Sequence, residues 1–348
     1  MPAFVVSVAR GRYICVLAGA DPDTGIAGAE RDGDGSPLVT AMRARELGRK
    51  SVVVGDRVYL VGDTTGRDGA LARIVRIAER TSVLRRTADD DETTAEGRLE
   101  RVVVANADQL VIVSSLADPP PRTGFIDRCL VAAYDADITP LLCLTKSDLA
   151  GPEEVLDYYA ELDLRYVLLR PDSDLAELRR LLADRISVLV GHSGVGKSTL
   201  VNRLVPDAAR AVGTVSAIGR GRHTSTSAVA LHLPAVPDTG PDKNDTGPDK
   251  NDGGPDGEHG GPDGEHGTGW IIDTPGIRSF GLAHVSADSL LHGFSDLVEG
   301  TVDCPPNCEH TTAEADCALP AWVAAGHADE RRLASYRRLL ASRAGETE

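Results

Sequence analysis

The stretch Gly191-His192-Ser193-Gly194-Val195-Gly196-Lys197-Ser198-Thr199 fits the pattern G-x-x-x-x-G-K-[ST]. An apolar run over 186–190 precedes it, and a helix-like segment over 200–204 follows it, which is the strand, loop and helix context that this pattern requires. Such a loop turns its backbone N–H groups toward a phosphate chain at the positive end of the helix. Lys197 would neutralise the β- and γ-phosphates, and Ser198 would offer its hydroxyl to Mg²⁺. The alternative is a glycine-rich turn with an exposed lysine, which this context disfavours.

Length and composition bound the class of protein. The chain has 348 residues, which suits two or three domains, and 41% of them are hydrophobic, which supports globular folding. No apolar run reaches the length of a membrane span, and Arg10 and Arg12 interrupt the N-terminal apolar stretch. We therefore expect a cytoplasmic protein with no membrane partner, acting as a monomer.

The charge is concentrated in one segment. The net charge of −16 argues at first against a nucleic-acid partner, because phosphate binding needs a positive surface. However, nine acidic residues stand against two lysines within the low-complexity repeats of 238–265. The rest of the chain is mildly acidic and leaves the question open. Such a composition cannot bury a core, so the segment is predicted to be a disordered extension.

The N-terminal region has the pattern of a small β-barrel. Short β-branched runs over 12–16, 51–60 and 70–77 are separated by Gly-Asp turns, which predicts several short strands. Arginines are frequent among them, so this region is the best candidate for an RNA-facing surface. Solvated strand faces explain the arginines equally well at this stage.

The middle of the chain alternates strands and helices. Strands are predicted over 110–115 and 140–144 with a helix over 125–135 between them, which implies a parallel sheet. The second strand leads into Thr145-Lys146-Ser147-Asp148, a variant of the guanine-reading motif N-K-x-D. Asp148 can accept hydrogen bonds from N1–H and the exocyclic amine of guanine, which adenine does not offer, while the Lys146 stem would lie over the base. The alternative to base recognition is that Lys146 and Asp148 are ordinary surface residues after a strand. A phosphate loop in the same chain favours base recognition.

A third phosphate-linked motif follows the acidic repeats. Residues 270–273 are predicted to form a strand that ends in Asp273-Thr274-Pro275-Gly276, which fits D-x-x-G. Asp273 would hold Mg²⁺ through water, and the Gly276 amide would sense the γ-phosphate. A plain Pro-Gly turn after a strand is the alternative.

The C-terminal region carries a cluster of metal-binding residue types, Cys304, Cys308, His310 and Cys317. Three thiolates and one imidazole form a closed tetrahedral set with no position for water, which predicts a structural zinc ion. The tail over 318–343 has a helical pattern with several arginines as a possible basic face.

The order of these motifs identifies a relationship. In ordinary GTPases the phosphate loop comes first and the guanine motif last, whereas here the guanine motif precedes the phosphate loop and D-x-x-G follows it. A permuted domain of this kind, flanked by a small barrel and a Cys-x-x-x-Cys-x-His-x₆-Cys element, resembles the RsgA (YjeQ) family of GTPases that depend on the small ribosomal subunit. The segments 106–109 and 221–224 also look like family motifs.

The resemblance implies a three-domain α/β architecture. We expect an OB-type β-barrel that binds RNA over 1–97, a circularly permuted P-loop GTPase domain over 98–282 with an acidic insert at 236–268, and a zinc-binding helical domain over 283–348. It also implies GTP hydrolysis that is stimulated by the small (30S) ribosomal subunit and its rRNA, in the late maturation of that subunit.

Three features depart from the family pattern. Thr145 stands where asparagine is usual, which removes an amide that normally ties the base-reading loop to the phosphate loop. The expected Ser-Ala loop is not recognisable within 168–174, so its contact to guanine is unassigned. The acidic repeats look foreign to the family core.

The residue after the D-x-x-G motif cannot supply the polar group that orients water for hydrolysis. Ile277 follows the D-x-x-G motif where a water-orienting glutamine often sits, so intrinsic hydrolysis is expected to be slow. His223, in a glycine- and hydroxyl-rich loop, is the candidate for the catalytic group. The alternative is that His223 is a loop histidine without a catalytic role. The rival functions are a GTP-controlled RNA-binding switch with incidental hydrolysis, and an ATPase of the same loop class.

Overall fold

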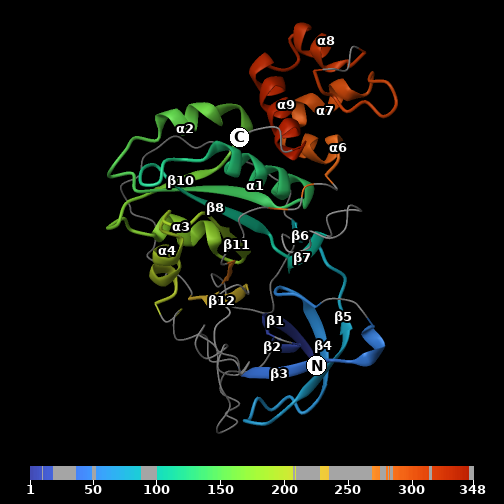
Figure 1. Cartoon of the computed structure of the whole chain (residues 1–348), viewed down its shortest axis with the longest axis vertical. Helices are drawn as coiled ribbons and strands as arrows, with labels where there is room; N and C mark the ends of the chain where they lie inside the picture. Colours follow the sequence, from blue (N-terminus) through green and yellow to red (C-terminus); the bar gives the residue numbers. More distant parts are fainter. Residues whose placement is uncertain are drawn as a thin grey trace, which may run out of the picture.

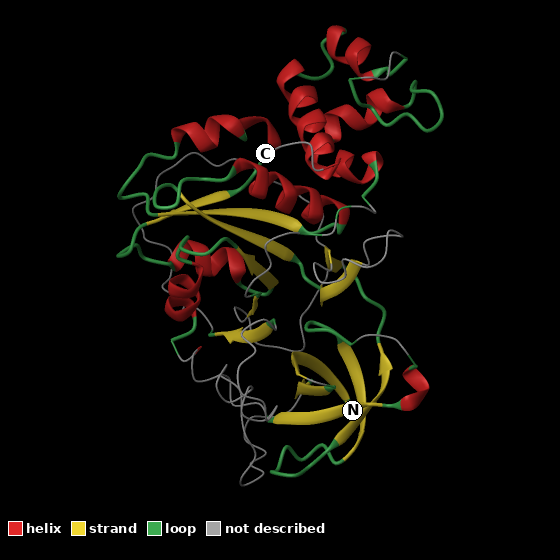
Figure 2. Ribbon diagram, viewed as in Figure 1, coloured by secondary structure: helices red, strands yellow, loops and turns green. Residues whose placement is uncertain are grey.

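The computed structural model describes most of the chain in three connected parts (Figure 1, Figure 2). The described residues are 1–9, 11–18, 37–48, 52–87, 100–206, 208, 228–234, 269–274, 280, 282, 285–312 and 316–344. The predicted disordered segment, His223, Gly276 and Ile277 lie outside them. Among the described helices, none combines the length and apolarity needed to cross a bilayer.

The N-terminal part is a closed barrel, drawn in blue in Figure 1. Its elements are β1 (Pro2–Ala9), β2 (Arg12–Leu17), β3 (Leu38–Arg43), the 3₁₀ turn η1 (Arg45–Leu47), β4 (Arg57–Gly62) and β5 (Ala72–Ile77). The strands pair in the order β1-β2-β3-β5-β4, and a further pairing between β1 and β4 closes the circle. Alternating side chains of these strands, such as Val58, Leu60 and Ile74, fill the interior. The predicted barrel is therefore present.

A two-stranded hairpin and a larger sheet follow. The hairpin consists of β6 (Val83–Thr87) and β7 (Glu100–Ala105). The next elements are β8 (Gln109–Ser115), α1 (Thr123–Asp135), β9 (Thr139–Thr145), α2 (Glu153–Tyr158), η2 (Ala160–Leu162), β10 (Tyr166–Leu169), α3 (Ala176–Leu182), β11 (Ile186–Val190), α4 (Lys197–Leu204), β12 (Val229–Leu233) and β13 (Gly269–Asp273). The strands and helix predicted for the middle of the chain correspond to β8, β9 and α1, with small differences at their ends.

The larger sheet has the order β10-β9-β8-β11-β13-β12. Every neighbouring pair is parallel except β12 and β13, which are antiparallel. All residues of β8 and β11 are buried, because helices cover both faces of a parallel sheet. Helices α1 and α2 lie on one face, and α3 and α4 lie on the other (Figure 1).

The barrel and this sheet are hydrogen-bonded to each other. Ser7 of β1 pairs with Val229 of β12, so the two sheets are continuous. Asn106, which follows β7, forms a separate connection to the barrel segment: its side-chain oxygen accepts from the Thr81 amide at 2.9 Å, and its side-chain nitrogen donates to the Gly55 carbonyl at 2.8 Å. The segment that looked like a family motif therefore has a structural role here.

The C-terminal part is a group of short helices, drawn in orange and red at the top of Figure 1. They are α6 (Ala287–Leu290), η3 (Leu291–Gly293), α7 (Ser295–Val298), η4 (Glu299–Thr301), α8 (Leu319–Ala324) and α9 (Glu330–Ala344). Helix α9 packs on α1, and its apolar residues Leu333, Tyr336, Leu339 and Leu340 join the core that covers this face of the sheet.

Two arginines of the tail, which was predicted to carry a possible basic face, form ion pairs within the protein. Arg332 forms ion pairs with Asp163 and Asp296, and Arg338 forms one with Asp127. Asp127 lies on α1 and Asp163 directly follows η2, and both elements pack against α9, so these arginines help to hold this helix in place.

Candidate functional site

The three predicted phosphate and base motifs meet at one edge of the parallel sheet. Thr145 ends β9, Val190 ends β11 and Asp273 ends β13. Because these strands are parallel, their carboxyl ends lie at the same edge, where α/β proteins bind ligands. The residues that follow the strands are therefore neighbours despite their separation in the sequence.

The loop over 191–196 has the backbone that its glycines permit. Gly194 and Gly196 have φ values of 85° and 91°, in the left-handed region that favours glycine. A Cβ atom on Gly191 would lie 2.7 Å from the Val113 carbonyl oxygen, so the chain passes β8 too closely for a side chain. Val195 is buried beneath the loop, and α4 begins immediately afterwards at Lys197. This geometry points the start of a helix at the sheet edge.

The loop also packs against α1. The ring of His192 lies 4.2 Å from that of Phe125, measured between centroids and tilted by 53°. Ser193, Ser198 and Thr199 are exposed at the same edge. No sequence pattern indicated the contact between His192 and Phe125, since it joins two distant segments.

Lys197 and Asp273 form an ion pair. Both were predicted to serve the same phosphate and Mg²⁺ site, and the structure brings them together from β13 and the start of α4. Thr274 is fixed beside them because its hydroxyl donates to the Leu189 carbonyl at 2.7 Å. Gly276, which completes the motif, lies outside the described part of the chain.

The predicted base-reading residues follow β9. Thr145 is buried, and its hydroxyl donates to the Val195 carbonyl at 2.6 Å. Lys146 has a φ of 58° and donates from its ammonium group to the Asp118 carbonyl. The Ser147 amide donates to the Leu169 carbonyl at 3.2 Å, and Asp148 is exposed. The absence of the asparagine amide was expected to remove the connection to the phosphate loop. The Thr145 hydroxyl makes this connection instead.

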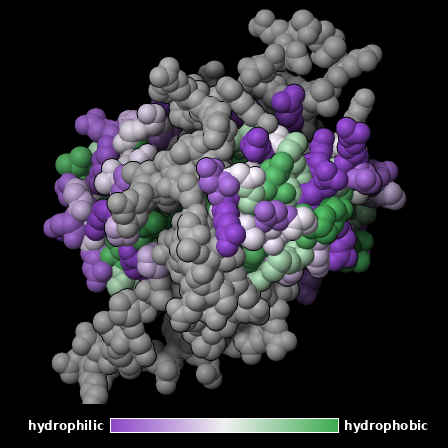
Figure 3. Space-filling view, turned by 90° about the horizontal axis from the view of Figure 1, so that it is seen from below, coloured by the Kyte–Doolittle hydropathy of each residue, from purple (hydrophilic) through white to green (hydrophobic). Residues whose placement is uncertain are grey.

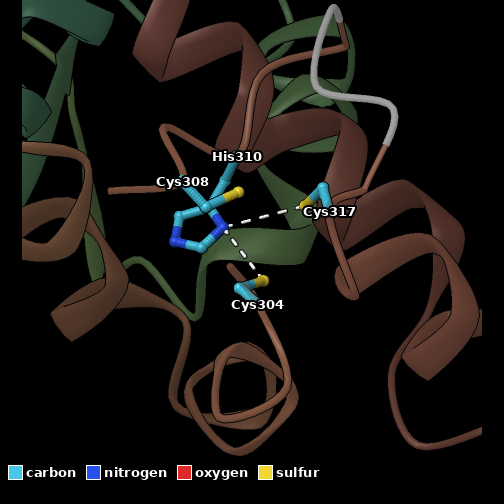
Figure 4. A group of neighbouring side chains, drawn as sticks. All are labelled: Cys304, Cys308, His310 and Cys317. Carbon is cyan, nitrogen blue, oxygen red and sulfur yellow. Dashed lines mark hydrogen bonds between the residues drawn. The ribbon is translucent and has the colours of Figure 1, made fainter. Parts of the chain in front are cut away.

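The four predicted metal ligands lie together (Figure 4). The ligand atoms of Cys304, Cys308, His310 and Cys317 all lie within 4.8 Å of one another. The Nδ1 atom of His310 is 3.5 Å from the Cys304 sulfur and 3.7 Å from the Cys317 sulfur. A tetrahedral zinc ion with Zn–S near 2.3 Å places its ligand atoms roughly 3.5–3.8 Å apart. The residues therefore fit such an ion, with Nδ1 as the imidazole ligand.

The surroundings of this cluster orient its ligands. The Arg337 side chain donates to the His310 carbonyl at 3.1 Å, and the Ala318 amide donates to the Cys304 sulfur at 3.3 Å. His310 is buried and its Nε2 atom lies 3.8 Å from the Asp288 carboxylate. An amide donor to a cysteine sulfur stabilises the thiolate form that metals require.

Comparison with known proteins decides the family. The model of the RsgA GTPase family matches residues 77–240. The small ribosomal subunit biogenesis GTPase RsgA of Chlorobaculum parvum is 34% identical over 302 residues, which cover 85% of this chain and 86% of that protein. The chain belongs to the RsgA GTPase family. The RsgA protein of Nitrosospira multiformis is 33% identical over 315 residues, covering 89% of this chain and 85% of the relative.

Solved structures confirm the fold of this RsgA family member. YjeQ from Thermotoga maritima aligns with a TM-score of 0.60 and 21% identity, covering 99% of both chains. YloQ, described as a circularly permuted GTPase, aligns with a TM-score of 0.59 and 20% identity, covering 100% of this chain and 96% of its own. The predicted architecture of barrel, permuted α/β domain and C-terminal Cys/His element is therefore confirmed.

Proposed function

We propose that this protein hydrolyses GTP at the carboxyl edge of its parallel sheet and acts in the biogenesis of the small ribosomal subunit. The observation that carries the proposal is the 2.6 Å hydrogen bond from Thr145 to Val195, which joins the base-reading segment to the phosphate loop. A guanine-reading aspartate and a phosphate loop are thereby held in one site. The RsgA names of the curated relatives support the same activity and the same pathway.

The chain's own groups have separate tasks in this mechanism. The loop amides of 191–196 and the Lys197 ammonium bind the β- and γ-phosphates, so Lys197 exchanges its partner Asp273 for phosphate when nucleotide arrives. Ser198 and Asp273 are then available to hold Mg²⁺, which neutralises charge on the phosphates when bound. Asp148 reads the guanine edge.

Hydrolysis needs a polar group that positions water, and the aliphatic Ile277 cannot supply it. We assign this task to His223, on the sequence pattern of its loop alone. Replacing His223 with alanine is expected to lower turnover stimulated by small subunits by about 10²-fold while GTP affinity stays unchanged. Retention of full stimulation would move the catalytic group to the ribosome.

The flanking parts provide contacts and stability. We propose that the Cys304, Cys308, His310 and Cys317 cluster holds one structural zinc ion.

We propose that the barrel binds rRNA. Exposed Arg57, Arg73 and Arg76 lie on β4 and β5, and the Arg76 guanidinium stacks on the Tyr59 ring at 3.7 Å. The barrel also exposes the apolar side chains Met42, Val61 and Val75. Figure 3 shows hydrophobic (green) and hydrophilic (purple) surface side by side on the coloured part of the molecule.

We also propose that the protein is a cytoplasmic monomer with domain boundaries at 1–97, 98–282 and 283–348. The small subunit and its rRNA are the partners in this account.

Base preference tests the proposed activity directly. Asp148→Asn replaces an acceptor by an amide, which can donate to the additional carbonyl of xanthine. The variant is expected to lose at least tenfold in GTP affinity and to gain affinity for XTP. Glu153→Gln, a change from carboxylate to amide at the start of α2, serves as the matched control. Equal binding of GTP by Asp148→Asn and the unmodified protein would contradict the guanine assignment.

A further inference from the structure

The turn that follows β10 occupies the place where the family's Ser-Ala loop was expected but not recognisable, and it lies beside the base-reading residues. It spans residues 170–174, between β10 and α3, and it starts where Leu169 pairs in parallel register with Thr145. The turn is closed twice: the Ser173 amide donates to the Arg170 carbonyl at 3.2 Å, and the Arg170 amide donates to the Ser173 hydroxyl at 2.8 Å. It therefore has a defined shape next to the site where Asp148 would read a base.

Arg203 ties this turn to the helix of the phosphate loop. It lies on α4, which begins at Lys197, and its guanidinium donates to the carbonyls of Arg170, at 3.4 Å, and Ser173. The first and last residues of the closed turn are thus bound by one planar group. A guanidinium suits this arrangement because its donors form a rigid fork, whereas an ammonium group is a single point.

Arg179 supports Arg203 from the preceding helix, α3. Its guanidinium donates to the carbonyls of Arg203 and Leu204, at 3.0 and 2.8 Å, which satisfies the C-terminal end of α4. The end of α4 is fixed by Arg179, and the turn is fixed to α4 by Arg203. The phosphate loop, its helix and the turn are in this way connected through side chains to backbone carbonyls.

We propose that Arg203 is a positioning residue for guanine, which holds the turn over 170–174 as the second wall of the base site. The inference rests on the proposed GTP site and deepens it. A trans peptide places the N–H of the next residue opposite the carbonyl, so the bond to the Ser173 carbonyl also fixes the direction of the Asp174 amide. Arg203 acts through the turn, and it affects the base half of the nucleotide more than the phosphate half.

The test separates these two halves. Binding of GDP and of inorganic tripolyphosphate, each with Mg²⁺, is measured for the full-length protein and for Arg203→Ala. GDP affinity is expected to fall about tenfold, while tripolyphosphate affinity stays within about twofold. Arg203→Lys keeps the charge but binds only one carbonyl at a time. Its GDP affinity is therefore expected to lie between those of the unmodified protein and Arg203→Ala.

Two further arginines provide controls. Arg180 is exposed on α3, so Arg180→Ala is expected to bind GDP like the unmodified protein. Arg179→Ala removes the bonds at the end of α4, and it reports a structural loss through its melting temperature. An Arg203→Ala variant with unchanged GDP affinity, or with equal losses for GDP and tripolyphosphate, would overturn the proposal. If Arg203→Ala does not fold, the same comparison with Arg203→Lys decides, and a GDP affinity equal to that of the unmodified protein would overturn it.

Failure of the proposed function has a different signature. In that case the unmodified protein itself would bind ADP as well as GDP. If Arg203→Ala binds GDP in preference to ADP as strongly as the unmodified protein does, the proposed GTP site stands and only the role of Arg203 is rejected.

Discussion

The hydroxyl of Thr145 donates a 2.6 Å hydrogen bond to the backbone carbonyl of Val195. Thr145 ends β9, while Val195 lies 50 residues later in the phosphate loop. Because Thr145 is buried, this bond is shielded from water and holds the two loops in a fixed relation. A shorter side chain than asparagine therefore serves the same connection.

Thr145→Val tests the importance of this bond. Valine keeps the shape of threonine but leaves the buried carbonyl without its donor, which costs about 1–3 kcal/mol. GDP affinity, measured by calorimetry, is expected to fall about tenfold. Thr145→Ser keeps the hydroxyl and is expected to bind GDP nearly normally, and equal affinities for the serine and valine variants would contradict the account.

Much of this site was predictable because its chemistry is written in contiguous motifs. The loop over 191–199, the segment over 145–148 and Asp273 each follow a strand, and parallel strands bring such residues to one edge. The four Cys and His ligands were equally accessible, since their spacing and residue types define a metal site.

The remaining contacts could not be predicted because they join distant segments that have no pattern of their own. Arg203 contacts a turn formed by residues 30 or more positions earlier. The arginines of α9 looked like a basic surface, but Arg332 and Arg338 bind carboxylates on α1, on α7 and directly after η2. Only the packing of the helices reveals those partners.

Cys308→Ser is expected to release the metal and loosen the C-terminal part. A hydroxyl is a poor substitute for a thiolate, and the four-ligand set has no spare member. Metal analysis should therefore find less than one zinc ion per chain, while GDP affinity is retained because the phosphate loop is elsewhere. Cys143→Ser, a buried thiol within β9, is the control for metal content. A full zinc ion in Cys308→Ser would reject the ligand set.

The contact between Arg338 and Asp127 is expected to stabilise the docking of α9 on α1. Asp127 is buried, accepts from the Tyr159 hydroxyl at 3.0 Å and lies 3.5 Å from the Arg338 guanidinium. Arg338→Met is expected to cost about 1–3 kcal/mol in urea unfolding, since the pair is buried on one side and partly exposed on the other. Adding Asp127→Asn should recover part of this loss, and strictly additive effects would show that the two residues do not interact.

The same carboxylate predicts a dependence on pH. Burial raises the pKa of Asp127, and the nearby Arg338 charge offsets only part of that rise. A raised pKa in the folded state means that the folded chain binds this proton more tightly than the unfolded chain. The resulting stabilisation is complete below the unfolded pKa near 4 and is lost as the pH rises through the folded value. Asp127→Asn should therefore gain stability relative to the unmodified protein from about pH 4 upward in urea titrations, and a constant difference would contradict this.

Deleting residues 236–268 is expected to leave stability and GTP turnover nearly unchanged. Leu233 and Gly269 are paired neighbours at the ends of β12 and β13, so a short turn can replace the acidic segment between them. Removing its negative charge is also expected to strengthen binding to small subunits at low salt. A fall of more than about 5 °C in melting temperature would show that the segment contributes to the fold.

Single-turnover hydrolysis with and without purified small ribosomal subunits tests the central claim most directly. Radiolabelled GTP and ATP are compared under identical conditions. We expect slow release of phosphate from GTP alone, strong acceleration by small subunits, and little hydrolysis of ATP in either case. Equal rates for GTP and ATP, or a GTP rate that small subunits leave unchanged, would contradict the central claim.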